Sequence, residues 1–211
     1  MPSKKQIDSF YSNYSDIRAS EEVLRENSKN NIKKLQKYGI NKSSKLLDFG
    51  CGKGVFTENG GKFWNKYDLY TCDQRILLKK ETYDCVTSWG VLEHVINPIK
   101  TLSEINSYLR TGGIVALTTV SIETSIPYRL KPPEHVTFWT ESAILKLFEK
   151  SGFELLACDL YTMSQKREVY MGAILRTMPL SLKRKVDFSK LPKMIKNLPT
   201  NEIFVVGKKT S

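Results

Sequence analysis

The sequence contains few of the residues from which metal centres and disulfide frameworks are built. Its 211 residues include four cysteines and two histidines. The cysteines, Cys51, Cys72, Cys85 and Cys158, are far apart and form no Cys-x-x-Cys pair. Structural zinc and disulfides are therefore not expected, and such isolated thiols are typical of a reducing, cytoplasmic compartment.

Long apolar runs are also missing. The first residues, MPSKKQIDSF, lack the apolar stretch that a secretory signal needs. No run approaches the roughly 18 apolar residues that cross a bilayer. The longest, 114–120, instead predicts a strand. We therefore expect a cytoplasmic protein with neither a secretory signal nor a membrane-spanning helix.

Acidic residues are scarce relative to basic ones, with 22 against 33 and a net charge of +11. The imbalance is concentrated in residues 162–201, where nine Lys or Arg face two acids, a local net charge of +7. A basic segment is most often a solvated surface, whereas an anionic substrate, an anionic lipid or RNA are the sharper hypotheses.

The same segment carries two apolar stripes at helical spacing. The stripes are Tyr170, Met171, Ile174, Leu175 and Met178, and then Leu191, Met194, Ile195 and Leu198. We predict a basic helical insertion at 162–201 that folds back as a lid near the acceptor pocket, with its charges outward. The alternative reading is an interfacial contact with a membrane.

The stretch 45–54, KLLDFGCGKG, is the most informative part of the chain. Leu46 and Leu47 end a short apolar run of the kind that forms a buried parallel strand. Asp48 stops the run, and three glycines follow at alternate positions: Gly50, Gly52 and Gly54. Glycine tolerates positive φ and has no Cβ, so such a loop can pass close to a ligand at the carboxyl end of the strand.

Two phosphate-binding motifs do not fit this stretch. The dinucleotide fingerprint needs a third glycine where Val55 stands. A P-loop needs Ser or Thr after Lys53, where Gly54 stands. The pattern suits a ligand with a charged amino-acid head and no phosphates.

The rest of the chain reads as alternating helices and strands of one α/β domain, 45–211, behind an N-terminal helical extension, 1–44. Expected strands are Asp68–Cys72, Tyr83–Ser88, 114–120, 153–158 and 203–206. One helix is expected to begin after the N-cap Ser20 and to stop at Gly39. A second begins at Asn97-Pro98 and closes at Gly112-Gly113, and its buried stripe is Ile99, Leu102, Ile105 and Leu109. A third is capped by Thr140.

At this point the chain resembles the class I S-adenosylmethionine-dependent methyltransferases. The glycine loop matches their first motif, and the block from Tyr83 to Gly113, YDCVTSWGVLEHVINPIKTLSEINSYLRTGG, matches along its length. The resemblance implies a Rossmann-like fold, a mostly parallel sheet whose last strand is antiparallel, and S-adenosylmethionine as cofactor. Compact O-methyltransferases of ubiquinone, polysaccharide and natural-product pathways are the most similar group.

One departure from the family predicts a smaller sheet. Only nine residues, 74–82, separate Asp73 from the next strand, and a crossover alone needs a dozen or more. We therefore expect one edge to be trimmed, leaving about six strands with Asp68–Cys72 at the edge.

The resemblance also assigns the cofactor site. Its residues are expected to be Asp48, Gly50, Cys51, Gly52, Gly54, Asp73, Trp89, Gly90 and Val91. Asp73 would accept hydrogen bonds from the two ribose hydroxyls, since two acceptor oxygens match two vicinal donors. Some ubiquinone-pathway relatives bind a metal near the Glu-His-Val motif, but Gly90 replaces their first carboxylate, so no metal is expected.

A catalytic base is needed only when the acceptor is a hydroxyl that must lose its proton. His135 is the first candidate, because it follows the fifth strand of the family fold, where acceptor-facing residues lie. His94 is the second, with a capping or packing role as the alternative. Glu134 and Glu93 are weaker options.

These features favour O-methylation of a small molecule or of a glycan or lipid-linked acceptor, with anionic character suggested by the charge. Two alternatives stay open. The first is an RNA or protein methyltransferase, although nucleic acid is the less favoured partner. The second is a non-catalytic subunit that binds S-adenosylmethionine.

Overall fold

The structure, a computed structural model, describes residues 20–67, 78–123, 134–177, 179 and 190–210. Its centre is a six-stranded sheet in the order β2-β1-β3-β4-β6-β5. The strands are β1 (Leu46–Phe49), β2 (Trp64–Tyr67), β3 (Tyr83–Trp89), β4 (Leu109–Val120), β5 (Phe153–Lys166) and β6 (Met194–Lys209). The helices are α2 (Glu21–Gln36), α3 (Val55–Glu58), the 3₁₀ turn η2 (Leu92–His94), α4 (Pro98–Tyr108), α5 (Glu141–Lys150) and α6 (Arg167–Thr177).

The sheet is parallel except at its last strand. Strands β2, β1, β3 and β4 run parallel, and β6 is antiparallel to both β4 and β5. This confirms the α/β Rossmann-like methyltransferase fold with about six strands and an antiparallel last strand. Within the described residues β2 is the trimmed edge.

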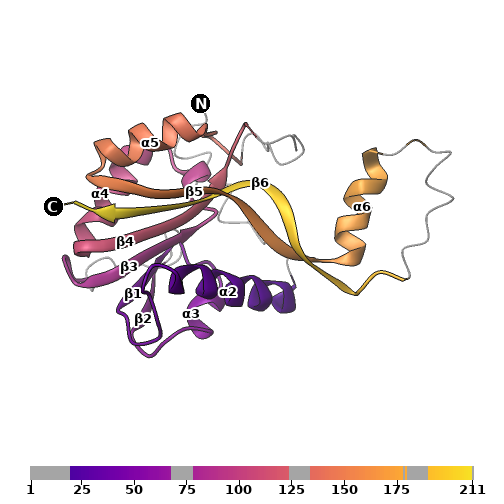
Figure 1. Cartoon of the computed structure of the whole chain (residues 1–211), viewed down its shortest axis with the longest axis horizontal. Helices are drawn as coiled ribbons and strands as arrows, with labels where there is room; N and C mark the ends of the chain where they lie inside the picture. Colours follow the sequence, from indigo (N-terminus) through magenta and orange to yellow (C-terminus); the bar gives the residue numbers. More distant parts are fainter. Residues whose placement is uncertain (1–19, 68–77, 124–133, 178, 180–189, 211) are drawn as a thin grey trace.

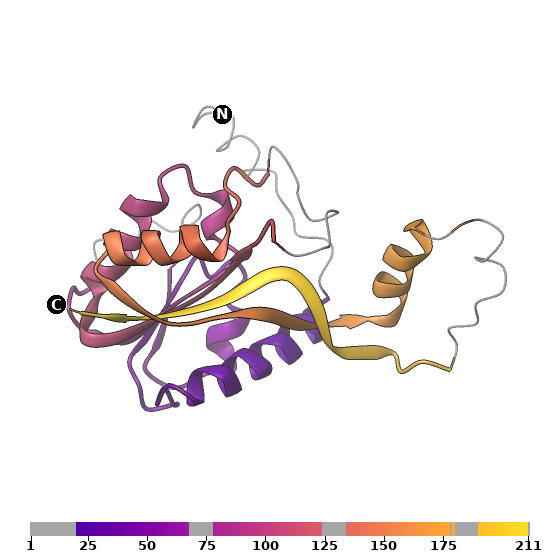
Figure 2. The same cartoon turned by 45° about the horizontal axis from the view of Figure 1, so that its top comes forward.

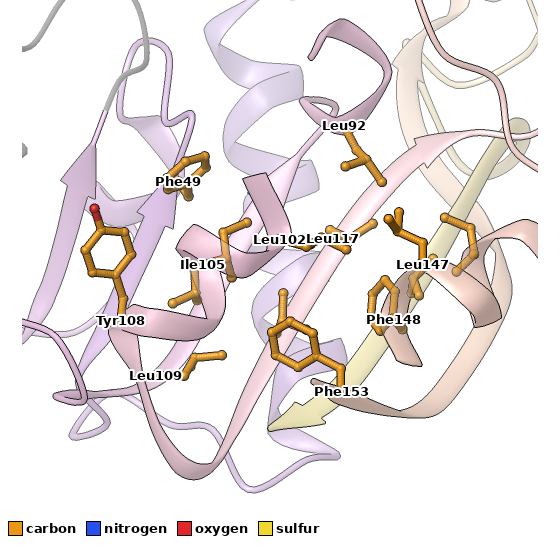
Figure 3. Packing of buried hydrophobic residues seen from close by; sticks show 14 of the residues in the cluster. Phe49, Leu92, Leu102, Ile105, Tyr108, Leu109, Leu117, Leu147, Phe148 and Phe153 are labelled. Carbon is orange, nitrogen blue, oxygen red and sulfur yellow. The ribbon is translucent and has the colours of Figure 1, made fainter. Parts of the chain in front are cut away.

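Helices cover both faces of the sheet, α4 and α5 on one side and α2 and α3 on the other (Figure 1). The residues that fill the first layer include Phe49, Leu102, Ile105, Phe148 and Phe153, which converge in Figure 3. The second layer contains Leu35, Phe56, Trp64, Tyr161 and Phe204. No helix of the described chain is long and apolar enough to cross a membrane.

Helix starts follow the predicted caps. Thr140 Oγ1 accepts a hydrogen bond from the Ala143 amide at 3.1 Å, and Asn97 Oδ1 accepts one from the Lys100 amide at 3.0 Å. Ser20 occupies the N-cap of α2 without a side-chain capping bond. Gly39 and Gly152 have positive φ after α2 and α5, as expected of helix stops.

Two predicted boundaries are wrong. Helix α4 ends at Tyr108, not at Gly112-Gly113, because Leu109 already pairs with Tyr83 and the glycines lie within β4. Ile99, predicted in its buried stripe, is 46% exposed. The edge strand begins at Trp64, since β2 pairs with β1 from Leu46↔Trp64 onward; the predicted strand Asp68–Cys72 lies outside the described residues.

The largest correction concerns the basic segment. Helix α6 confirms that Tyr170, Met171, Ile174 and Leu175 of the first apolar stripe lie in a helix, while Met178 lies outside the described residues. Leu191–Leu198, in contrast, is not a helix. Its last residues belong to β6, because they pair with β5 at Lys166↔Met194, Gln165↔Ile195 and Met163↔Leu198. In both views α6 stands away from the sheet and its covering helices, so the described part of the segment does not form the predicted lid (Figures 1 and 2).

Candidate functional site

The glycine loop after β1 adopts the backbone that its sequence predicts. Gly50, Gly52 and Gly54 have φ of 82°, 49° and 75°. Gly54 is the N-cap of α3, so the loop leads directly into a helix. A left-handed backbone at three alternate positions leaves main-chain groups uncovered by side chains at the carboxyl end of β1, where ligands of open α/β sheets bind.

Asp48 lies buried at the end of the same strand, only 2% exposed. Thr87 Oγ1 in β3 donates a hydrogen bond of 2.7 Å to its Oδ1 atom. Burial raises the pKa of the Asp48 carboxyl to about 7, and the Thr87 hydrogen bond opposes this only in part. The predicted cofactor loop therefore begins at a carboxyl group whose pKa is raised toward neutral pH by burial.

The segment after β3 packs directly against the glycine loop. Gly90 has φ of 64°, and its amide donates to the Thr118 carbonyl and Oγ1 at 3.2 and 3.0 Å. Val91 Cγ2 would lie 2.4 Å from a Cβ placed on Gly50. The predicted residues of the two segments thus meet at one edge of the sheet.

Trp89 and Cys51, two other residues predicted to bind the cofactor, have different surroundings. The Trp89 ring stacks on Phe204 at 6.2 Å and meets Phe56 edge-on at 5.2 Å, so it faces the α2 and α3 layer. Cys51 is partly exposed on the loop. Asp73 lies outside the described residues.

A cluster of Glu93, His94 and His135 forms beside this edge. The two imidazole rings contact edge-to-face with centroids 4.8 Å apart. His94 Nδ1 lies 2.9 Å from the Glu134 carbonyl oxygen, which can only accept, so this nitrogen carries a proton. Glu93, 3% exposed, accepts a 3.0 Å hydrogen bond from Thr119 Oγ1.

Backbone hydrogen bonds hold the His135 loop against η2. The amides of Val136 and Thr137 donate to the Glu93 carbonyl at 2.8 and 3.2 Å. Thr137 Oγ1 donates to the Leu92 carbonyl at 2.9 Å. The structure therefore brings both histidines together, although 40 residues separate them. Sequence reasoning missed Thr119 and Thr137, which no motif marks.

The cluster offers donor atoms that a metal could share. One oxygen of Glu93 and one nitrogen from each histidine all lie within 4.8 Å of one another. Imidazole and carboxylate suit zinc and related transition metals. The expectation of no metal rested on Gly90 alone and stays a prediction.

Comparison with known proteins identifies the family. Residues 22–157 match the family model described as a methyltransferase domain. Because the match covers more than half of the chain, the protein belongs to this family. The fold, the glycine loop and the family match together define a methyltransferase domain of the class I, Rossmann-like architecture.

The curated relatives are distant and differ in substrate. The chain is 28% identical over 163 residues to a tRNA U34 carboxymethyltransferase of Pseudoalteromonas translucida, covering 60% of this chain and 51% of the relative. It is 28% identical over 105 residues to a ubiquinone biosynthesis O-methyltransferase of Photobacterium profundum, covering 36% and 44%. The chain thus spans about half the length of the curated relatives it matches.

The solved structures agree on the fold. A SAM-dependent methyltransferase from Aquifex aeolicus aligns with a TM-score of 0.55 over 99% of both chains, at 12% identity. At that identity the likeness concerns the fold alone, so the acceptor has to be argued from the site.

Proposed function

We propose that the protein transfers the methyl group of S-adenosylmethionine to a hydroxyl of a small molecule or of a glycan or lipid-linked acceptor. The observation that carries this proposal is the pairing of His94 and His135 over the buried carboxylate of Glu93. A hydroxyl is the acceptor that needs a base, and this cluster would supply one beside the predicted cofactor loop.

In the proposed reaction His135 takes the proton of the acceptor hydroxyl as its oxygen attacks the methyl carbon. S-adenosylmethionine would supply an electrophilic methyl group on a sulfonium, and its loss to the acceptor oxygen would leave a neutral thioether. Glu93 would stabilise the positive charge gained by the imidazole pair, since its Oε1 lies 4.0 Å from His94 Nε2. The backbone that holds Val136 and Thr137 to η2 would fix the base in place.

The base is expected to contribute 10²–10⁴-fold. Most of the remaining acceleration would come from holding acceptor and methyl in line, an effect worth roughly 7–11 kcal/mol. The base would therefore contribute less to the rate acceleration than the alignment of acceptor and methyl group does, and its main effect would be to allow a hydroxyl as acceptor.

Two alternatives remain. A tRNA-modifying relative and the net charge of +11 favour RNA, but no Asn/Asp-Pro-Pro-Tyr/Phe tetrapeptide of amino-methylating enzymes follows β3, where the chain reads Ser88-Trp89-Gly90-Val91. A non-catalytic subunit would bind the cofactor without turnover on any acceptor.

Calorimetric titration tests the cofactor assignment. We expect S-adenosylmethionine and its demethylated product to bind with micromolar affinity, about −8 kcal/mol, and NAD not to bind. Asp73→Ala should weaken binding by roughly 1.5–3 kcal/mol, because hydrogen bonds to a charged acceptor are lost. Tight binding of NAD without a response to S-adenosylmethionine would contradict the assignment.

Label transfer from S-adenosylmethionine tests the base. Across a panel of catechols, sugars and sugar nucleotides, His135→Asn should lower turnover by 10²–10⁴-fold while cofactor affinity is kept. Undiminished turnover in His135→Asn would rule the base out, and methylation of amines or RNA alone would favour the alternative acceptors.

A further inference from the structure

Strands β5 and β6 continue well past the rest of the sheet and carry α6 at their end (Figures 1 and 2). The last pair between β4 and β6 is Val120↔Glu202, so residues 162–166 and 194–199 pair only with each other. We call residues 162–177 and 190–199 the arm.

The arm leaves the sheet at the end that holds the candidate site. Strand β6 is antiparallel to both β4 and β5, so β5 runs in the direction of the parallel strands. The arm continues β5 past Tyr161 and therefore extends from the carboxyl ends, where the glycine loop and the histidine pair also lie. A partner surface bound by the arm would therefore lie on the side of the molecule that carries the candidate site.

The base of the arm is fixed to α2. A register shift between Met163 and Gln165 leaves Ser164 out of the β5–β6 ladder, and the Asn27 side chain bonds both of its backbone groups, at 2.6 Å to the amide and 3.1 Å to the carbonyl. Lys196 pairs with Glu26 at 2.5 Å. These contacts with Asn27 and Glu26 fix the orientation of the arm relative to α2.

The arm combines basic and aliphatic surface. Within the described residues Arg167 is paired with Glu168 and Lys196 with Glu26, whereas Lys166, Lys190 and Lys193 form no salt bridge. The side chains of Val169 and Leu191 are 46% and 40% exposed beside these lysines in sequence. Such a surface has charge for an anionic partner and aliphatic groups that gain by leaving water.

We infer that the arm docks the protein on an anionic phospholipid bilayer, with the site end of the sheet facing the lipid. Charge complementarity supports an anionic surface, and the exposed aliphatic side chains favour lipid, because single-stranded nucleic acid is bound through aromatic stacking. The inference does not depend on the proposed O-methylation, and it would explain how a lipid-linked acceptor reaches the site.

Vesicle binding by the full-length protein tests the inference without any acceptor. We expect binding to vesicles of phosphatidylcholine with phosphatidylglycerol, weakening with salt, and no binding to phosphatidylcholine alone. Changing Lys166, Lys190 and Lys193 to Gln should weaken binding about 100-fold, roughly fivefold for each lysine. The combined changes V169S and L191S should weaken it further at fixed charge.

Matched control variants distinguish binding through the arm from the effect of net charge and from nonspecific binding through exposed aliphatic side chains. The exposed residues Lys42, Lys150 and Lys208 lie near the amino ends of the strands, and their change to Gln removes the same charge. Leu145, 42% exposed on α5, is the aliphatic control. Both control variants should bind vesicles like the unaltered protein, and thermal unfolding checks that every variant is folded.

Three results would overturn the inference. The first is no binding to anionic vesicles at low salt. The second is equal loss in the arm and control lysine variants, which would make the effect one of net charge. The third is tighter binding to a hairpin RNA or an oligouridylate than to vesicles, lost with the same three arm lysines, which would assign the arm to nucleic acid.

Discussion

The buried carboxyl of Asp48 makes stability depend on pH. Its folded pKa of about 7 lies above the ordinary value of 3.8, so between these values the folded state holds a proton that the unfolded state releases. Stability from this group is therefore full at low pH and declines as pH rises from about 4 to about 7. The decline amounts to at most about 4 kcal/mol, at 1.36 kcal/mol per pKa unit.

The measurement is urea unfolding of the cofactor-free protein and of Asp48→Asn across this pH range. Because the amide cannot ionise, the stability difference between the two proteins should shrink or reverse as pH rises. A constant difference between pH 4 and pH 8 would show that Asp48 titrates normally.

Gly50 and Gly52 form a natural pair for testing the cofactor loop. Both have positive φ, which costs an alanine about 1–2 kcal/mol. A Cβ on Gly50 would also lie 2.4 Å from Val91 Cγ2, whereas one on Gly52 meets no atom within 4 Å. We expect Gly50→Ala to cost about 1–3 kcal/mol more than Gly52→Ala, because of overpacking.

Urea unfolding measures both costs, and Val91→Ala is the rescue. In the Gly50→Ala background that second change should recover the overpacking part, leaving only the backbone part. If the two glycine variants are equally stable, the contact between the two loops does not constrain Gly50.

At the scale of elements, the side chain of Asn27 on α2 binds the arm where Ser164 leaves the β5–β6 ladder. Ser164 is fully buried at the register shift of β5, and buried backbone groups need partners. Removing the Asn27 side chain leaves both groups unpaired. We expect Asn27→Ala to speed hydrogen exchange of the Ser164 amide by about 10–100-fold, corresponding to 1.4–2.8 kcal/mol.

Asn30→Ala is the matched control on the same helix. Asn30 Nδ2 approaches Ser164 Oγ at 3.5 Å, the limit of a hydrogen bond, and this contact leaves the backbone of Ser164 to Asn27. Exchange of the Ser164 amide should therefore stay nearly unchanged. Equal acceleration in both variants would mean that α2 packing as a whole, and not Asn27, protects the strand.

Sequence predicted best the elements whose signals are local. Thr140 and Asn97 cap helices where expected, and the glycine loop has the backbone that its spacing requires. The segment Leu191–Leu198 was mispredicted because its helical spacing competes with long-range pairing to β5, which no local pattern reports. The site shows the same division. His94 and His135 could each be named, but their contact depends on backbone bonds between η2 and a loop 40 residues later.

At the scale of the whole molecule, most of the net positive charge and most of the apolar core lie in different parts of the chain. Residues 162–201 carry +7 of the net +11, so the remainder carries +4. The two core clusters include Tyr161 and Met163 but nothing from α6. The segment 162–201 thus supplies most of the net charge, and the arm within it supplies little of the apolar core, which predicts that the body can fold without the arm.

The register gives a direct way to remove the arm. Met163 and Leu198 are paired neighbours on antiparallel strands, so an Asn-Gly turn can replace residues 164–197. This removes all nine basic and both acidic residues of the segment. We expect the shortened protein to keep its fold and its affinity for S-adenosylmethionine, and to lose about 1–3 kcal/mol of stability with the Ser164 contacts. It should no longer bind anionic vesicles.

Calorimetry, urea unfolding and vesicle sedimentation report these outcomes separately. Loss of cofactor affinity in a folded, shortened protein would mean that the arm is part of the methyltransferase site, because the parallel strands that hold the glycine loop are left intact.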